Sequence, residues 1–152
     1  HLGVATWKVP RVADFMRKKM QDDIETISAF DGVEELLVSL EAAGVRLGLV
    51  SSNSWENIEA VLGANASLFV HRSCGVSIFG KATKLRKILS ASGTRPEDAL
   101  FVGDELRDEE AARAVGMKFG AVAWGYNRPD VLRLRHPDEW FGTVQELFTR
   151  LA

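Results

Sequence analysis

The most informative part of the sequence is the stretch Leu100-Phe-Val-Gly-Asp104-Glu-Leu-Arg-Asp108. Its apolar residues suit a strand buried on both faces, and Gly103 lets the backbone turn where that strand ends. In open α/β sheets, ligands bind in the crevice at the carboxyl ends of the strands, so Asp104 is expected to face a site. The stretch therefore predicts an α/β fold with two carboxylates, four residues apart, at the start of a helix.

Asp104 and Asp108 are suitable ligands for Mg²⁺, which usually binds one or two carboxylates together with waters and substrate phosphate oxygens. The structural alternative is that Asp108 and Glu109 only favour the positive end of the helix dipole, while Asp104 makes a turn. This stretch alone leaves both interpretations open.

Two further segments carry groups that suit a phosphate. An apolar strand near residues 46–51 runs into Ser51, Ser52 and Asn53, whose hydroxyl and amide groups precede a helix at about 55–62. Lys81 follows a glycine and opens another helix, so its ammonium is expected to reach the same anion. Lys84 lies one turn further on, and the sequence does not decide which of the two lysines binds the anion.

These features resemble motifs two, three and four of the haloacid dehalogenase-like hydrolase superfamily: serine after a strand, lysine at a helix start, then Gly-Asp-x-x-x-Asp after a later strand. Residues 30–44 and 124–127 look like the matching parts of its phosphoglycolate phosphatase-like members. The resemblance extends over most of the chain, from about residue 30 to 151. The acidic pair is similar to the metal-dependent phosphatases, whereas the haloacid-cleaving members need no Mg²⁺.

The resemblance implies a Rossmann-like, three-layer parallel sheet and a magnesium-dependent phosphatase that hydrolyses a small phosphorylated metabolite through an aspartyl-phosphate. It implies that Ser51, Lys81 and Asp104 are catalytic and that Ser52 and Asn53 contact the substrate. Asp104 would ligate Mg²⁺, and Asp108 would hold the waters of the metal or orient Asp104. Two alternatives are a phosphosugar mutase of the same superfamily and a non-catalytic phosphate-binding module.

The first motif of the superfamily, Asp-x-Asp-x-Thr, supplies the nucleophile and is absent from the 152 residues. None of the acidic residues nearest the N-terminus follows an apolar strand: Asp14, Asp22, Asp23 and Asp31. Because residue 1 is His and not Met, we expect a truncated chain that is inactive by itself. Residues 1–28 are then the tail of a helical cap, and residues 29–152 are the core.

By the same resemblance, the missing first strand lies between the strands that precede motifs two and four. Its loss would leave two rows of unpaired backbone groups, so we expect complementation by another segment or self-association of the chain. The remaining strands are expected at 46–51, 68–72, 99–102, 119–123 and 139–141. Three residues, each followed by a carboxylate three positions later, predict helix caps: Asp31, Thr94 and Thr143.

The composition excludes several other classes of protein. A hydrophobic content of 46% is enough for the core of one domain, and a net charge of −2 gives no basic footprint for nucleic acid. The sequence has no apolar run of the length that spans a membrane. A single cysteine, Cys74, cannot form an internal disulfide, so a reducing cytoplasm is the expected compartment.

Overall fold

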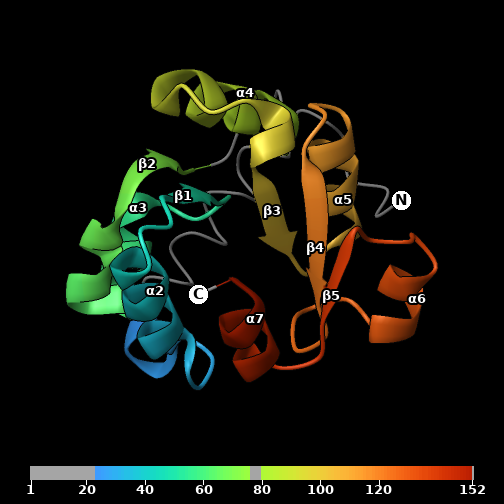
Figure 1. The fold of residues 1–152 in the computed structure, drawn as a ribbon. Helices are drawn as coiled ribbons and strands as arrows, with labels where there is room; N and C mark the ends of the chain where they lie inside the picture. The colour runs from blue at the N-terminus through green and yellow to red at the C-terminus, as the bar shows by residue number, and fades with distance from the viewer. Residues whose placement is uncertain (1–22, 76–79, 152) are drawn as a thin grey trace, which may run out of the picture.

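The computed structural model describes residues 23–75 and 80–151, in which helices and parallel strands alternate along the chain (Figure 1). The predicted α/β class is therefore confirmed. The elements are η2 (Ile24–Thr26), α2 (Val33–Ala42), β1 (Leu47–Val50), α3 (Trp55–Leu62), η3 (Gly63–Leu68), β2 (Phe69–Ser73), α4 (Gly80–Ser92), η4 (Pro96–Asp98), β3 (Leu100–Gly103), α5 (Leu106–Arg113), β4 (Lys118–Val122), α6 (Pro129–Arg133), β5 (Glu139–Phe141) and α7 (Val144–Leu151).

The strands form two parallel sheets, and all five lie within one residue of their predicted bounds. β1 pairs with β2, while β3, β4 and β5 pair in that order. Within the described residues, β1 and β3 are not paired with each other, and each has a strand partner on one side only. In Figure 1 these two strands are neighbours across the space between the sheets.

Helices pack on both faces, and β4 shows why the arrangement has three layers. Phe119 and Ala121 belong to a buried cluster that includes Leu85 of α4 and Ala112 of α5. Val122 belongs to a second cluster with residues of α2, β5 and α7, namely Leu36, Leu40, Phe141 and Leu147. Successive side chains of a strand point to opposite faces, so the two clusters lie on opposite sides of the sheet.

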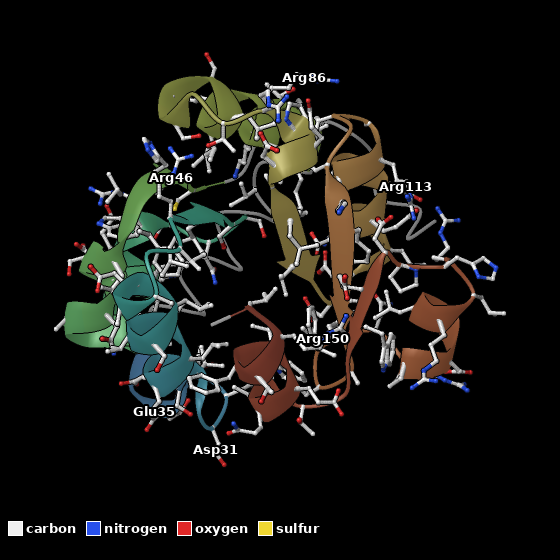
Figure 2. The ribbon with its side chains drawn as sticks, viewed as in Figure 1. Asp31, Glu35, Arg46, Arg86, Arg113 and Arg150 are labelled. Carbon is white, nitrogen blue, oxygen red and sulfur yellow. The ribbon has the colours of Figure 1, made fainter. Side chains whose placement is uncertain are left out.

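Helix α4 ties the two halves of the molecule together. Arg46, just before β1, donates to the carbonyl oxygen of Ser92 at 2.9 Å, and Arg86 donates to that of Ala114, just after α5, at 3.0 Å. Both arginines lie near α4 in Figure 2. The core also joins the two sheets, because Val50 of β1 and Phe101 of β3 both pack against the buried cluster that contains Leu85 of α4.

The three predicted helix caps have different outcomes. Thr143 is confirmed, because its hydroxyl oxygen accepts a hydrogen bond from the backbone N–H of Glu146 at 3.1 Å. Asp31 is wrong: α2 begins after Gly32, whose φ of 82° suits glycine, and no side chain caps it. Thr94 is also wrong, because Arg95 precedes η4 and the Thr94 hydroxyl oxygen instead accepts from Arg46 and Ser92.

The predicted cap tail, residues 1–28, lies mostly outside the described residues. The same is true of Asp14 and Asp22, two of the acidic residues considered as nucleophiles. Among the helices that the structure describes, none has the length and apolar character needed to cross a membrane.

Candidate active site

The loop after β1 presents Ser51 at the carboxyl end of that strand. Its hydroxyl oxygen accepts a hydrogen bond from the backbone N–H of Asn53 at 3.1 Å, which closes a tight turn. The hydroxyl proton therefore remains available for an anion. The chain then enters α3, where Ser54 caps the helix by accepting from the N–H of Asn57 at 3.3 Å. Ser52 is exposed and Asn53 is half-buried.

Lys81 lies in the first turn of α4 and reaches toward the segment after β3. Its ammonium pairs with Asp108 Oδ1 and with Glu105 Oε2, the latter at 3.2 Å. The side chain of Asp108 is 4% exposed and that of Lys81 is 21% exposed. Lys81 and Asp108, 27 residues apart in the sequence, are thus in direct contact.

Lys84 follows Lys81 by one helical turn, but it contacts the loops after β1 and β2 instead. Its ammonium donates to the carbonyl oxygen of Ser51 at 2.5 Å and to that of Gly75. Burial lowers the pKa of Lys84. The start of α4 therefore brings the carboxyl end of β1 and the helix start after β3 to one place.

Asp104 follows β3 and is enclosed by the turn over residues 124–127. Its Oδ2 accepts from the backbone N–H of Tyr126 at 2.5 Å, and its carbonyl oxygen accepts from that of Asn127 at 3.3 Å. Gly125 is required for this approach, because a Cβ there would lie 2.0 Å from the Cβ of Asp104. In the sequence this turn stands out only through the family resemblance, and its spacing does not reveal the contact with Asp104.

Asp108 takes part in the start of α5 and in the contact with Lys81. It forms a capping box with Glu105 at the start of α5, and its Oδ2 accepts from the N–H of Glu105 at 3.2 Å. It also pairs with Lys81, which favours the charged carboxylate. Burial has the larger effect and raises the pKa of Asp108 above its ordinary value. The helix-start interpretation and the site interpretation are therefore compatible.

Residues 1–122, which are most of the chain, match the sequence pattern of the haloacid dehalogenase-like hydrolase family. The chain belongs to the haloacid dehalogenase-like hydrolase family. It is 35% identical over 147 residues to a phosphoglycolate phosphatase of Synechococcus elongatus, covering 95% of this chain and 69% of that protein.

Two further similarities concern a second relative and a solved structure with a similar fold. A phosphoglycolate phosphatase of Salmonella typhi is 31% identical over 131 residues, which cover 81% of this chain but 51% of that protein. The chain thus spans only about half the length of that relative. A haloacid dehalogenase-like hydrolase structure from Streptococcus pneumoniae superposes with a TM-score of 0.78 at 18% identity, covering 99% of this chain and 73% of that one.

The phosphatase members of the family imply Mg²⁺, and the carboxylates of Asp104 and Asp108 near β3 are the kind of ligand that this ion binds. Asp104 offers a hard carboxylate, and in the described residues only its Oδ2 has a hydrogen-bond partner. Both oxygens of Asp108 are engaged, but each carboxylate oxygen can accept a second contact. No group of three or more His, Cys, Asp or Glu side chains within residues 23–75 and 80–151 is arranged around a metal position. Waters and phosphate oxygens would complete the coordination.

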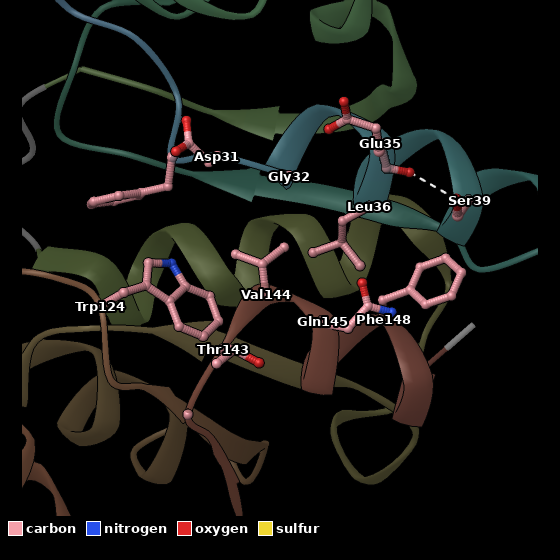
Figure 3. Close-up of a pocket in the computed structure, with 12 residues that line it drawn as sticks. Asp31, Gly32, Glu35, Leu36, Ser39, Trp124, Thr143, Val144, Gln145 and Phe148 are labelled. Atoms are coloured by element: carbon pink, nitrogen blue, oxygen red, sulfur yellow. Dashed lines mark hydrogen bonds between the residues drawn. The ribbon is translucent and has the colours of Figure 1, made fainter.

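One cavity of this haloacid dehalogenase-like chain lies apart from the predicted site residues. It measures about 960 Å³ and lies between α2, α7 and the turn after β4 (Figure 3). Leu36 of α2 and Val144 of α7 point toward each other across it. Trp124 is its only lining residue that belongs to the turn enclosing Asp104. None of the six predicted site residues lines this cavity.

A buried carboxylate on α5 anchors the helix that carries Asp108. Glu109 is 7% exposed at its side chain and accepts from Arg113 at 3.0 Å and from Arg135 at 2.8 Å. Arg113 lies at the end of α5 (Figure 2). Burial raises the pKa of Glu109, but the hydrogen bonds from Arg135 and Arg113 outweigh it, so the pKa lies below its ordinary value.

We expect Glu109→Gln to lower the free energy of unfolding by about 1 to 3 kcal/mol at pH 7. Because the folded-state pKa is lowered, this stabilisation is present above the unfolded-state pKa and disappears as the pH falls through the folded-state value. Urea unfolding at pH 7 and at about pH 3.5 measures the difference. Glu110→Gln is the control, since Glu110 is largely exposed and lies 3.8 Å from Arg135. An equal loss at both pH values would contradict the ion-pair explanation.

Proposed function

We propose that this chain is the core of a magnesium-dependent phosphomonoester hydrolase that works through an aspartyl-phosphate. The observation that carries the proposal is the convergence at α4: the chain segment at Ser51 and the Asp108 carboxylate are both held by lysines within one helical turn. This arrangement supplies a hydroxyl donor, cations and acidic groups at the carboxyl edge of the sheet, where α/β proteins bind ligands.

Each predicted residue has a role in this mechanism. The Ser51 hydroxyl group donates a hydrogen bond to a phosphoryl oxygen, and Lys81 offsets the negative charge of the phosphoryl group and of Asp108. Asp104 would ligate the metal, and Asp108 would hold the waters of the metal or orient Asp104. Mg²⁺, when bound, neutralises phosphoryl oxygens as a Lewis acid. Ser52 and Asn53 are proposed to contact the substrate.

The nucleophile is proposed to come from a segment that the 152 residues do not contain, since Asp-x-Asp-x-Thr is absent. An oxygen of that aspartate attacks phosphorus, and the bond from phosphorus to the ester oxygen breaks. The alcohol leaves with a proton from a general acid, and water then hydrolyses the aspartyl-phosphate to inorganic phosphate. The proposed occupant of the space between β1 and β3 is the parallel strand that ends in this aspartate. Both strands have a free edge within the described residues.

The proposed substrate is a small phosphorylated metabolite. The relatives named phosphoglycolate phosphatase make 2-phosphoglycolate the first compound to test. Ser51, Ser52 and Asn53 lie on the loop after β1 and would contact the phosphoryl group. The choice among phosphomonoesters therefore depends on other residues, which contact the rest of the substrate.

The test is phosphate release by the protein expressed from its natural reading frame, with 2-phosphoglycolate and a panel of sugar phosphates. We expect release in Mg²⁺, none after the metal is chelated, and a loss of about 10²-fold or more in Asp104→Asn. A product that retains its phosphoryl group and appears only with a bisphosphate activator would indicate a mutase. Phosphate binding without any turnover would indicate a non-catalytic module.

A further inference from the structure

Lys84 is a buried cation that has no carboxylate partner among the described residues. The residue is 8% exposed, and its ammonium donates to two neutral carbonyl oxygens, those of Ser51 and Gly75. Lys81, one turn earlier, instead pairs with two carboxylates. Lysine is rarely buried to this degree without an ionic partner, so its position calls for a function.

The contacts of Lys84 connect the loop after β1 to the loop after β2. The N–H of Ser51 donates to the carbonyl oxygen of Ser73 at 3.2 Å, and the N–H of Gly75 donates to that of Asn53 at 2.5 Å. Lys84 bonds the carbonyl oxygens of Ser51 and Gly75, so both backbone groups of Ser51 are engaged. The hydroxyl group of Ser51 is then the part of the residue left to meet a ligand.

We propose that Lys84 is a positioning residue that holds Ser51 by its main chain and thereby aims the Ser51 hydroxyl at the bound phosphoryl group. The inference rests on the proposed function for the role of Ser51. It divides the work of the two lysines: Lys81 balances acidic side chains, and Lys84 binds the backbone of the phosphate-binding loop. A charged donor suits this task, because hydrogen bonds from an ionised group are stronger than those between neutral groups.

Hydrogen exchange of this chain without ligand tests the contact itself. In Lys84→Met, the amides of Asn53 and Gly75 are expected to exchange about tenfold faster or more, while those of β4 keep their rates. Lys84→Arg keeps a cation and N–H donors and is expected to recover slow exchange. Lys87→Met is the control, because Lys87 is exposed on the same helix. Unchanged exchange at both amides in a folded Lys84→Met protein would overturn the proposal.

Binding of inorganic phosphate, measured by calorimetry, tests whether Lys84 acts through Ser51. Lys84→Met is expected to weaken phosphate binding about tenfold, and to cause no further loss in a Ser51→Ala background. An equal loss in that background would mean that Lys84 contacts the anion itself, which would overturn the proposal. If neither this chain nor the protein expressed from its natural reading frame binds phosphate, the proposed function fails at this site, and the exchange rates alone decide whether Lys84 holds the loop.

Discussion

Lys81→Met is expected to lower the free energy of unfolding by about 3 to 5 kcal/mol, because it leaves the carboxylate of Asp108 buried without its cation. Glu105, the second partner of Lys81, keeps an ion pair with Arg107 at 2.7 Å, so the cost should arise at Asp108. Urea unfolding at pH 7 measures the loss. The effect is large because a buried charge that loses its partner cannot regain the solvation it had in water.

The double variant Lys81→Met, Asp108→Asn provides the matched control. Asparagine keeps an oxygen that can accept from the N–H of Glu105, but it carries no charge. Most of the lost stability should therefore return in the double variant. If the double variant is as unstable as Lys81→Met alone, the loss comes from packing of the lysine side chain rather than from the unpaired carboxylate.

In the protein expressed from its natural reading frame, the same Lys81→Met change is expected to lower turnover by about 10³-fold, through loss of charge stabilisation at the phosphoryl group. Lys84→Met is expected to act through Ser51 and to cost less. Phosphate release under saturating 2-phosphoglycolate measures both variants. A loss confined to Lys84→Met would transfer the phosphate-binding role from Lys81 to Lys84.

Gly125→Ala is the second change with a large expected effect, because a Cβ at this position would lie 2.0 Å from the Cβ and 2.3 Å from Oδ2 of Asp104. The turn or Asp104 must move, and the hydrogen bond from the N–H of Tyr126 to Oδ2 would be lost. We expect a stability loss of about 2 to 3 kcal/mol. Thermal unfolding of this chain measures it, and phosphate release by the longer protein is expected to fall with it.

Gly142→Ala is the control for the added methyl group. A Cβ at Gly142 would meet only the end of the flexible Glu146 side chain, at 3.2 Å. Its unfolding temperature should change little. If Gly125→Ala is as stable as the unmodified chain and retains full turnover, close contact between Gly125 and Asp104 is not needed for the site.

The strands could be predicted well because their signal is local. Apolar runs bounded by glycine and polar residues locate β1 and β3, and parallel order follows from the alternation of strands with helices. The helix caps were harder, because Gly32 and not Asp31 occupies the cap position before α2, and Thr94 bonds to Arg46, which is 48 residues away. A partner that distant along the chain, such as Arg46 for Thr94, cannot be predicted from the spacing of neighbouring residues.

The same distinction applies to the site. The order of Ser51, Lys81 and Asp104 indicated one anion and metal site, but their spacing did not show which atoms meet. Lys81 and Lys84 are equivalent in the sequence, separated by one helical turn, and only the packing of α4 assigns them to different partners. The enclosure of Asp104 by Tyr126 also depends on a turn that follows the next strand.

The proposed hydrolase activity requires a segment that completes the sheet and supplies the nucleophile. The most direct measurement is the sequence of the natural reading frame upstream of His1. We predict an apolar strand followed by Asp-x-Asp-x-Thr, which would fill the space between β1 and β3 and end beside Lys81 and Asp104. A start codon immediately before His1, with no such segment, would contradict the hydrolase account and leave a phosphate-binding module without a nucleophile.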